Sequence, residues 1–373
     1  MFTTKKLLFF FFTTIIIYLL YTHFTTGEND FNRTVKSIRK HIPPVLQNAS
    51  DVNSGKASNH SQCPQGNIIT VGTTTYSGLG NKIWEYMSVF SAYNLYRNTF
   101  NLQAFVPQEI KQKVEKIFDS ISLPVIEDIP MDCHIQQRQN ITIDYHSLIS
   151  EDKVPKNEKI LIHLLKWSAK YEFVVPFGFE NIKKELRFKK KLVEKAQQKL
   201  HEIKKKFYNA DESDVVFVGM HYRGTDMIKM MRRELKDKFF EPPSCEYYNA
   251  AITYFQQKYK KAIFILITID FAWLDKNKKC LKHDINLVTN PVHPQSAIND
   301  LILLSHCNHS ITAYGTYSTT AALFAGGTTF VYDLGIPLDF DGPTLTMGLA
   351  EMLSNWYKIG NNGRLVSSLH IGK

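Results

Sequence analysis

The chain contains 373 residues and carries a formal net charge of +10. This length exceeds one ordinary domain and suits two domains with an appendage. A net positive charge is compatible with binding to nucleic acid, to a membrane surface or to an anionic small substrate. No segment reads as a nucleic-acid-binding module, so we expect no nucleic-acid partner.

The N-terminus predicts a membrane anchor. Residues 1–6 form a short tail with Lys5 and Lys6, and residues 7–24 are almost entirely apolar. This stretch approaches the ~20 residues needed to span a bilayer. It lacks a cleavage site of small residues, which favours an uncleaved signal-anchor over the alternative, a cleaved signal peptide. The lysines before the span, with Glu28 and Asp30 after it, favour a cytosolic N-terminus and a lumenal body.

Residues 25–65 predict a glycosylated stem, because Ser, Asn, Lys and His dominate and no apolar period is visible. The chain has five N-x-S/T sequons, which support a lumenal body: Asn32, Asn48, Asn59, Asn140 and Asn308. It also has five cysteines and no C-x-x-C: Cys63, Cys133, Cys245, Cys280 and Cys307. Two disulfides and one free thiol are compatible with an oxidising lumen, but the sequence leaves their pairing open.

Residues 66–210 predict a first, less regular α/β domain. We expect strands at 66–72 and 158–165, and a helix over 81–100 with Ile83, Met87, Phe90 and Tyr93 on one side. Much of the positive charge gathers in "RFKKKLVEKAQQKLHEIKKKF" (187–207). Its spacing predicts a solvated amphipathic helix whose apolar side contains Leu192, Ala196, Leu200 and Ile203.

Residues 211–345 predict a second, more regular α/β domain. Strands are expected at 214–220, 262–270, 284–289, 309–314 and 328–333. Helices are expected at 244–261, 271–281, 296–307 and 318–327, and a closing helix at 347–359 lies in the last segment, 346–373. Strands that alternate with helices at this spacing predict a parallel, doubly wound sheet.

The first candidate site motif is "SGLGNKIWEY" (77–86). Gly78 and Gly80 permit a tight turn and a close backbone approach to a ligand. Asn81 is placed at or near the N-cap of the following helix, whose free N–H groups and dipole attract negative charge. Position 83 is Ile, so the motif is not G-x-G-x-x-G, and a purely structural turn is the alternative.

The second motif is "HYRGTD" (221–226), which follows the strand "DVVFVGM". Open α/β sheets bind ligands beyond the carboxyl ends of their strands. Arg223 can clamp a phosphate through two parallel hydrogen bonds and stabilise a phosphate leaving group. His221 offers a donor to a base or ribose, and Asp226 can orient Arg223 or accept a proton from a substrate hydroxyl. A surface loop with an Arg–Asp pair is the alternative.

The third motif is "NDLILLSHCNHSITAYGTYSTTAALFAGG" (299–327). Asp300 is predicted to open a helix, where it either caps the helix or accepts two donors from a guanine edge. Thr316 and Ser318, with the N–H groups of the next helix start, form a second possible phosphate cradle. Two such turns in one sheet suggest a nucleotide.

Together and in this order, the three motifs resemble those of the inverting α1,2-fucosyltransferases (the galactoside 2-alpha-L-fucosyltransferases of glycosyltransferase family 11), nearest their invertebrate, nematode-like branch. They resemble the α1,6- and protein O-fucosyltransferases more distantly. "GLGN" is similar to the family's G-x-[LF]-G-N, "HYRGTD" to H-x-R-R-x-D, and "DLILLSHCNHSITAYGT" to D-x-x-L-L-x-x-C-N-H leading into G-T-[FY]. The resemblance covers roughly 67–333 and departs at Gly224, where many relatives have a second arginine.

The resemblance implies a GT-B-like fold of two Rossmann-like domains facing a cleft, with the acceptor side in 66–210 and the GDP-fucose site in 211–345. It implies GDP-fucose as donor substrate, a galactose-containing glycan of a glycoprotein or glycolipid as acceptor, and no cofactor or metal. The implied contacts are Arg223 on the diphosphate, His221 and Asp300 near guanosine, Thr316 and Ser318 in the phosphate turn, and Asn81 across the cleft. The single span and the stem are similar to those of type II Golgi glycosyltransferases.

Arg223 and the helix starts would then stabilise the leaving diphosphate in place of a metal, with Asp226 or Glu234 as a candidate base. "DFD" (339–341) is a D-x-D, the pattern of metal-dependent glycosyltransferases, but its proline-flanked context favours a surface turn. Two other functions stay open. One is a non-catalytic lumenal relative that binds nucleotide or glycan. The other is a fucosyltransferase for a core glycan or protein acceptor.

Overall fold

A computed structural model of the chain describes residues 63–72, 78–143, 159–164, 170–209, 211–234, 240–277, 279–281, 286–287, 294–336 and 345–366. The predicted signal-anchor, most of the stem and the D-x-D segment lie outside these residues. None of the described helices is long and apolar enough to cross a bilayer. The described residues belong to one compact unit of the chain, Asn59–Lys373.

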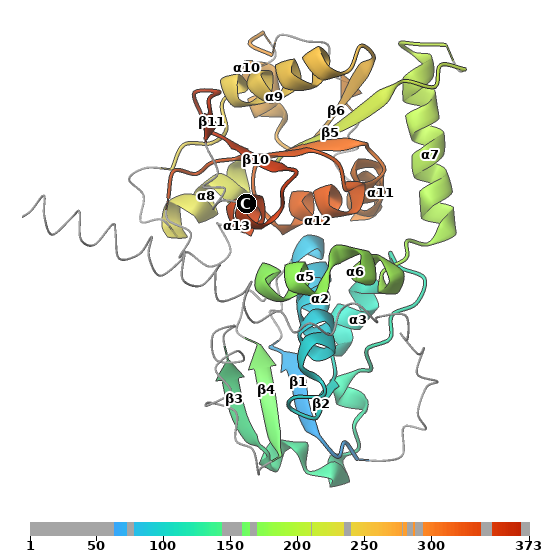
Figure 1. Cartoon of the computed structure of the whole chain (residues 1–373), viewed down its shortest axis with the longest axis vertical. Coiled ribbons are helices and arrows are strands. Elements are labelled where there is room, and N and C mark those ends of the chain that lie inside the picture. Colours follow the sequence, from blue (N-terminus) through green and yellow to red (C-terminus); the bar gives the residue numbers. More distant parts are fainter. Residues whose placement is uncertain are drawn as a thin grey trace, which may run out of the picture. The chain divides into compact units, whose positions relative to one another are not determined.

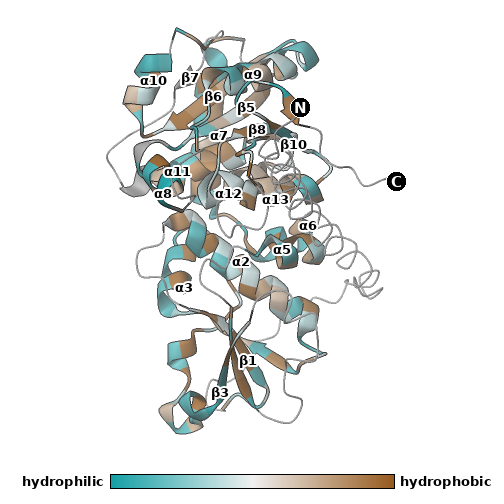
Figure 2. Cartoon of the chain, turned by 90° about the vertical axis from the view of Figure 1, so that its left-hand side faces the viewer, coloured by the Kyte–Doolittle hydropathy of each residue, from teal (hydrophilic) through white to brown (hydrophobic). Residues whose placement is uncertain are grey.

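The first half of the described chain is built on a four-stranded parallel sheet (Figure 1). In spatial order its strands are β2 (Leu102–Ala104), β1 (Asn67–Val71), β4 (Ile160–Leu164) and β3 (Gln139–Ile143). The predicted strands at 66–72 and 158–165 are therefore confirmed as β1 and β4. Both contain mostly Ile, Leu and Val, which suit a pleated buried surface, and β1 is brown in the hydropathy colouring of Figure 2.

Helix α2 (Leu79–Tyr96) follows β1 and is buried on all sides over most of its length. The predicted apolar side is confirmed for Ile83, Met87 and Phe90, but Lys82 and Glu85 are buried as well. Lys82 Nζ lies 3.1 Å from Glu85 Oε2 and 3.6 Å from Glu109 Oε2, so the buried charges are paired. The remaining helices of this half are α3 (Gln108–Val114), α5 (Tyr171–Phe177), α6 (Phe179–Glu185), α7 (Lys190–Lys205) and the single 3₁₀ turns η2 (Ile126–Asp128), η3 (Met131–Cys133) and η4 (Ile135–Gln137).

The predicted basic amphipathic helix is α7. Its buried residues are Ala196, Leu200 and Ile203, as expected from the spacing. This apolar side packs against helix α11 (Pro294–Ser305), while most of its lysines are exposed.

The second half is built on a seven-stranded sheet, which Figure 1 shows between helices on its two faces. In spatial order its strands are β11 (Leu365–Val366), β10 (Trp356–Ile359), β9 (Thr329–Tyr332), β8 (His309–Thr312), β5 (Val216–Tyr222), β6 (Ala262–Thr268) and β7 (Asn286–Leu287). The pairings from β10 to β7 are parallel, and only β11 runs antiparallel to its neighbour. The predicted parallel α/β sheet is confirmed. Its helices are α8 (Thr225–Glu234), α9 (Cys245–Lys258), α10 (Phe271–Asn277), α11, α12 (Thr316–Ala325) and α13 (Leu345–Met352).

The strand order contains a reversal between β5 and β8. From β5 the chain adds β6 and β7 on one side, and from β8 it adds β9 and β10 on the other. Such a switch point leaves a crevice beyond the carboxyl ends of the two strands, where α/β proteins bind ligands. The "HYRGTD" and "YGTYSTT" turns leave the sheet at this point.

Alternate residues of β5 face different helix layers. Val218, Met220 and Tyr222 belong to an apolar core that includes Tyr248 and Phe255 of α9. The intervening residues face α11 and α12. A Cβ on Gly219 would lie 2.9 Å from Leu304 Cδ2 and 3.2 Å from Cys307 Sγ, so α11 packs closely against this part of β5.

The predicted closing helix at 347–359 is wrong in its second half. Helix α13 ends at Met352, and Trp356–Ile359 form strand β10 beside β9. Asn355 is held at the change of direction, where its Nδ2 donates to the carbonyls of Gly326 and Gly327 at 3.1 and 2.9 Å. Trp356 is then buried at the strand start.

The cysteine pairing that the sequence left open is resolved by two disulfides. Cys63 bonds to Cys133, and Cys245 at the start of α9 bonds to Cys280 after α10. Cys307 is a buried free thiol. Each disulfide joins segments that are far apart in sequence, which limits the freedom of the unfolded chain.

Candidate functional site

The switch point brings two of the sequence motifs side by side. Strand β5 ends at Tyr222 and is followed by Arg223, and β8 ends at Thr312 and is followed by the turn that leads to α12. The hydroxyl of Tyr314 donates to the carbonyl of Arg223 at 3.1 Å, which ties the two turns together. The topology therefore supports the predicted neighbourhood of these motifs.

Arg223 is held by Asp226, in the first turn of α8. Arg223 Nη2 lies 2.5 Å and Nε 3.1 Å from Asp226 Oδ2. Burial alone would raise the pKa of Asp226, but the hydrogen bond and charge of Arg223 outweigh it and lower that pKa. Asp226 is therefore an ionised carboxylate that orients the guanidinium, and 39% of the Arg223 side chain remains exposed for another partner.

His221 lies inside the sheet rather than beyond it. The sequence predicted the strand to end at 220, but β5 continues because His221 pairs with Ile267 of β6 and Thr312 of β8. The side chain is buried, and its Nδ1 has no hydrogen-bond partner in the described part of the chain. Burial, with a smaller effect of Arg223, lowers the pKa of His221 to about 3. The imidazole is neutral at physiological pH and suits hydrogen bonding better than proton abstraction.

Asp300 lies in the middle of α11, which begins at Pro294, so the helix-capping role considered from the sequence is excluded. Among the described residues its carboxylate has no hydrogen-bond or ion-pair partner. Burial raises its pKa to about 7. A buried carboxylate without a hydrogen-bond partner is typical of a binding site in which a ligand supplies the hydrogen-bond donors.

Tyr317 joins Asp300 to His221, and the sequence reasoning did not single it out. Its ring centroid lies 5.1 Å from that of His221, and its hydroxyl donates to the carbonyl of Ala297 at 2.7 Å. Burial raises the pKa of Tyr317, and the nearby charge of Asp300 adds to the rise. The only signal in the sequence was its place within "YGTYSTT".

Helix α12 begins two residues earlier than predicted, at Thr316. Gly315, with φ of +93°, sets this start, since few other residues adopt that conformation. Ser318 is buried and its hydroxyl donates to the carbonyl of Tyr314 at 3.1 Å. A phosphate contact from Ser318 would therefore come from its backbone N–H, one of the first-turn donors that an α-helix leaves without an internal partner.

The start of α2 meets the start of α12. Gly78 is the N-cap of α2, so Asn81 lies in the first turn, near the cap as the sequence suggested but not at it. Its side-chain oxygen accepts a hydrogen bond from the Thr316 hydroxyl. A Cβ on Gly80 would lie 2.5 Å from the backbone nitrogen of Tyr317, which explains why this position holds glycine.

This contact brings together two helix ends of the same electrostatic sign. Each helix N-terminus carries about half a positive charge, and neither first turn contains an acidic residue. Negative charge from a ligand would stabilise both ends.

Gly224 allows a second close approach. A Cβ there would lie 1.8 Å from Oδ2 and 2.3 Å from Cβ of Asp270, so no larger residue fits without displacing Asp270. Asp270 is fixed in turn, because its Oδ1 accepts from Trp273 N at 2.9 Å at the start of α10. Position 224 therefore has no room for an arginine while Asp270 keeps this place.

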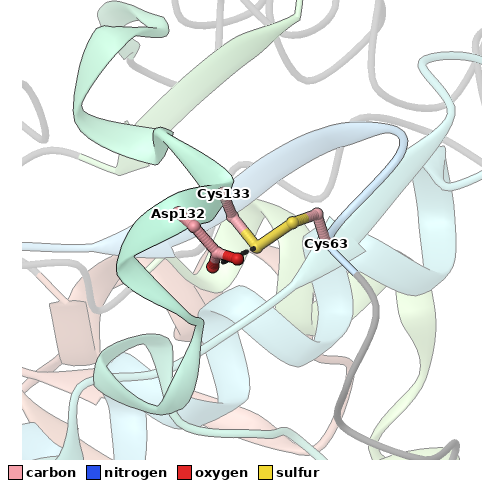
Figure 3. A group of neighbouring side chains, drawn as sticks. All are labelled: Cys63, Asp132 and Cys133. Atoms are coloured by element: carbon pink, nitrogen blue, oxygen red, sulfur yellow. Dashed lines mark hydrogen bonds between the residues drawn. A yellow bond between two sulfur atoms is a disulfide. The ribbon is translucent and has the colours of Figure 1, made fainter.

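The described residues contain two groups of potential metal ligands, and both are built around disulfides: Cys63, Asp132 and Cys133, and Cys245, Glu246 and Cys280. Figure 3 shows the first, with Asp132 Oδ1 4.0 Å from the sulfur of Cys133. A disulfide sulfur carries neither a proton to donate nor the thiolate charge that binds cations. Neither group is a candidate metal centre.

Comparison with known proteins agrees with this geometry. The sequence model of "Glycosyl transferase family 11" matches residues 65–359. Galactoside alpha-(1,2)-fucosyltransferase 1 of Sus scrofa is 25% identical over 291 residues, which are 77% of this chain and 72% of that protein. Galactoside alpha-(1,2)-fucosyltransferase 2 of Mus musculus is 26% identical over 286 residues, which are 75% of this chain and 76% of that protein.

A solved structure of fucosyltransferase NodZ from Bradyrhizobium aligns with 75% of this chain and all of that one, at 15% identity and a TM-score of 0.40. This likeness is too weak to carry an argument about the site.

Proposed function

The chain belongs to glycosyl transferase family 11, and on that premise we propose that it transfers L-fucose from GDP-fucose to a glycan hydroxyl. We take the acceptor to be the 2-OH of a galactose, and the reaction to proceed with inversion and without a metal ion. The names of the relatives at about 25% identity support the sugar and the linkage.

One observation carries the donor assignment: the starts of α2 and α12 meet beside the switch point, without an acidic residue in either first turn. A nucleoside diphosphate supplies the negative charge that such a pair of helix ends would attract. Arg223, held at the end of β5 by Asp226, supplies a full positive charge that can bind phosphate through two parallel hydrogen bonds.

The groups nearby suit a guanosine. Asp300 can accept hydrogen bonds from the two N–H donors of a guanine edge. These bonds would offset the free-energy cost of burying the ionised carboxylate. Neutral His221 packs its buried ring against Tyr317 beside this group. Tyr317 lies between the two and offers an aromatic face.

In the proposed mechanism the bond between fucose and the β-phosphate breaks while negative charge grows on the leaving diphosphate. Arg223 and the N–H groups at the helix starts stabilise that charge. Asp226 keeps the guanidinium in place, and its lowered pKa makes it a weak base. We therefore assign Asp226 to orientation of Arg223. The acceptor hydroxyl oxygen bonds to C1 of fucose from the opposite face of the sugar as the C1–phosphate bond breaks, which inverts the anomeric configuration, and the hydroxyl proton is released to solvent.

We also propose that the protein is a type II Golgi membrane protein with a lumenal body. The apolar stretch at 7–24 and the lysines before it support this orientation. Two disulfides within the body are compatible with an oxidising lumen.

The test is a transfer assay with residues 59–373 secreted from a eukaryotic host. Purified protein is mixed with GDP-fucose, EDTA and a panel that contains β-galactosides, core glycans and acceptor polypeptides, and products are identified by mass and linkage. We expect α1,2-fucosylated galactoside in EDTA, loss of product in Arg223→Ala, and a large reduction in Arg223→Lys, which cannot bind bidentately.

Arg232→Ala is the matched control, because this arginine is exposed on helix α8, which begins two residues after Arg223. Transfer only to a core glycan or polypeptide would refute the galactose assignment. Failure of a folded protein to bind GDP would refute the donor site.

A further inference from the structure

Strand β3 forms one edge of the four-stranded sheet and contains a sequon. Within the described residues it pairs only with β4, so among these residues its other side has no strand partner; Figure 1 shows β3 at the edge of this sheet. The sequon is Asn140–Ile141–Thr142, in the middle of the strand. Asn140 and Thr142 are both exposed. Residues two apart in a strand point to the same face, so the amide and the hydroxyl lie together on an accessible surface.

The other described sequon has a different setting. The side-chain oxygen of Asn308 accepts from Phe217 N at 2.8 Å, and its own backbone N–H donates to Phe217 O at 2.8 Å. Ser310 of the same sequon is buried in β8, between two other strands. Asn308 is thus part of the sheet pairing, and Asn140 is the described sequon whose side chain is free to carry a large group.

The position of Asn140 along the strand separates it from the carboxyl end of this sheet. Asn140 is opposite Leu161 in the register, three residues before the strand ends at Ile143. At about 3.3 Å per residue this is roughly 10 Å from the carboxyl end of the sheet. A group attached at Asn140 therefore leaves the carboxyl edge accessible.

The start of β3 is also firmly held. Arg138 donates from Nη1 to the carbonyl of Gly66 at 2.6 Å and from Nη2 to that of Pro64 at 2.5 Å. The Cys63–Cys133 disulfide joins the same two segments. The sequon is consequently presented on a fixed strand, so a modification there acts on the sheet edge itself.

We propose that Asn140 is an N-glycosylation site whose glycan covers the free edge of β3. The proposal rests on the lumenal orientation proposed above. The donor is an oligosaccharide linked to a lipid diphosphate. The bond from sugar C1 to the diphosphate oxygen breaks, a bond from C1 to Asn140 Nδ2 forms, and the amide nitrogen loses one proton. The attached glycan prevents this edge from pairing with a strand of another molecule.

The test uses the full chain expressed in a eukaryotic secretory host. An amidase that releases N-glycans in heavy-oxygen water converts each glycosylated Asn to a labelled Asp, and peptide mass spectrometry locates the label. We expect label at Asn140 in the natural chain and in Thr142→Ser, which keeps the sequon, and none in Thr142→Ala. Asn140→Gln should retain transfer per folded molecule but form more soluble oligomers or aggregates on storage.

An unlabelled Asn140 peptide beside labelled stem peptides at Asn48 or Asn59 would overturn the site while leaving the lumenal orientation intact. If none of the five sequons is labelled, the orientation and the site both fail. In either case the transfer assay on the purified protein reports separately on the proposed activity.

Discussion

Replacing Asp300 with asparagine should stabilise the ligand-free protein at pH 8. The pKa of Asp300 is raised from 3.8 to about 7 by burial, so the folded state holds this proton more tightly than the unfolded state. The free energy of unfolding should therefore fall as pH rises from about 4 to about 7, and the cost should be complete above pH 7. A shift of this size corresponds to at most about 4 kcal/mol. Because the side chain is partly solvated, we expect about 2 kcal/mol.

Urea unfolding at pH 5 and pH 8 measures this effect directly. Asp300→Asn should exceed the natural protein in stability at pH 8 by about 2 kcal/mol, and the difference should shrink towards pH 5. Asp226→Asn is the matched control with the opposite sign, because the net effect of Arg223 lowers the pKa of Asp226 and its stabilisation is lost on acidification. Equal stability of Asp300→Asn and the natural protein at pH 8 would refute the claim that this carboxylate is costly to ionise.

The same group should make donor binding depend on pH. If the ionised carboxylate of Asp300 accepts hydrogen bonds from guanine, GDP binds the deprotonated form. At pH 6 most protein molecules carry a proton on Asp300, and this proton must leave when GDP binds. Calorimetry should then show roughly tenfold weaker binding at pH 6 than at pH 8, with release of nearly one proton. Asp300→Asn should bind GDP weakly at both values of pH. A pH-independent affinity in the natural protein would exclude Asp300 from the guanine contact.

Two glycine substitutions test the packing of the site, and a double cysteine replacement tests a disulfide outside it. Gly80→Ala places a methyl group 2.5 Å from Tyr317 N and should reduce GDP affinity and transfer at least tenfold, whereas Gly78→Ala, with no atom within 4 Å, should leave both unchanged. Gly224→Ala meets the fixed Asp270 side chain and should cost about 1–3 kcal/mol in urea unfolding, and equal stability with the open-space control Gly72→Ala would contradict that contact. Replacing Cys63 and Cys133 together with serine should lower the free energy of unfolding by about 2–5 kcal/mol, and an unchanged value would show that this link does not restrain the unfolded chain.

Much of the second domain could be predicted from local sequence because its elements are long and regular. Strand β6 is an almost continuous apolar run, and Ser244 caps α9, since its hydroxyl accepts from Tyr247 N at 3.3 Å. The secondary-structure predictions were wrong where contacts with segments distant in the sequence determine the local structure. His221 extends β5 because two neighbouring strands pair with it, and Trp356–Ile359 leave the helical pattern because β9 offers a partner.

The features of the candidate site were likewise predictable where local sequence determines them, and were not predictable where distant contacts do. The motifs predicted that Arg223 and the α12 start would lie at strand ends, since that depends only on the order of elements. The sequence could not show that α2 meets α12, that Asp270 fills the space beside Gly224, or which cysteines pair. Each of these contacts joins residues that are separated by tens or hundreds of positions, and so depends on the completed packing.

The Cys63–Cys133 disulfide has a mechanical consequence. Any pull transmitted through residues 1–62 enters the described body at Cys63, four residues before β1 begins. Strand β1 lies between β2 and β4. Without the disulfide, tension would act first on the hydrogen bonds that join β1 to these two strands and would separate it from them. With it, the load passes through a covalent bond to residue 133, and the guanidinium of Arg138 clamps the carbonyls between Cys63 and the strand. A force applied at Cys63 therefore acts on covalent bonds before it acts on the hydrogen bonds between the strands.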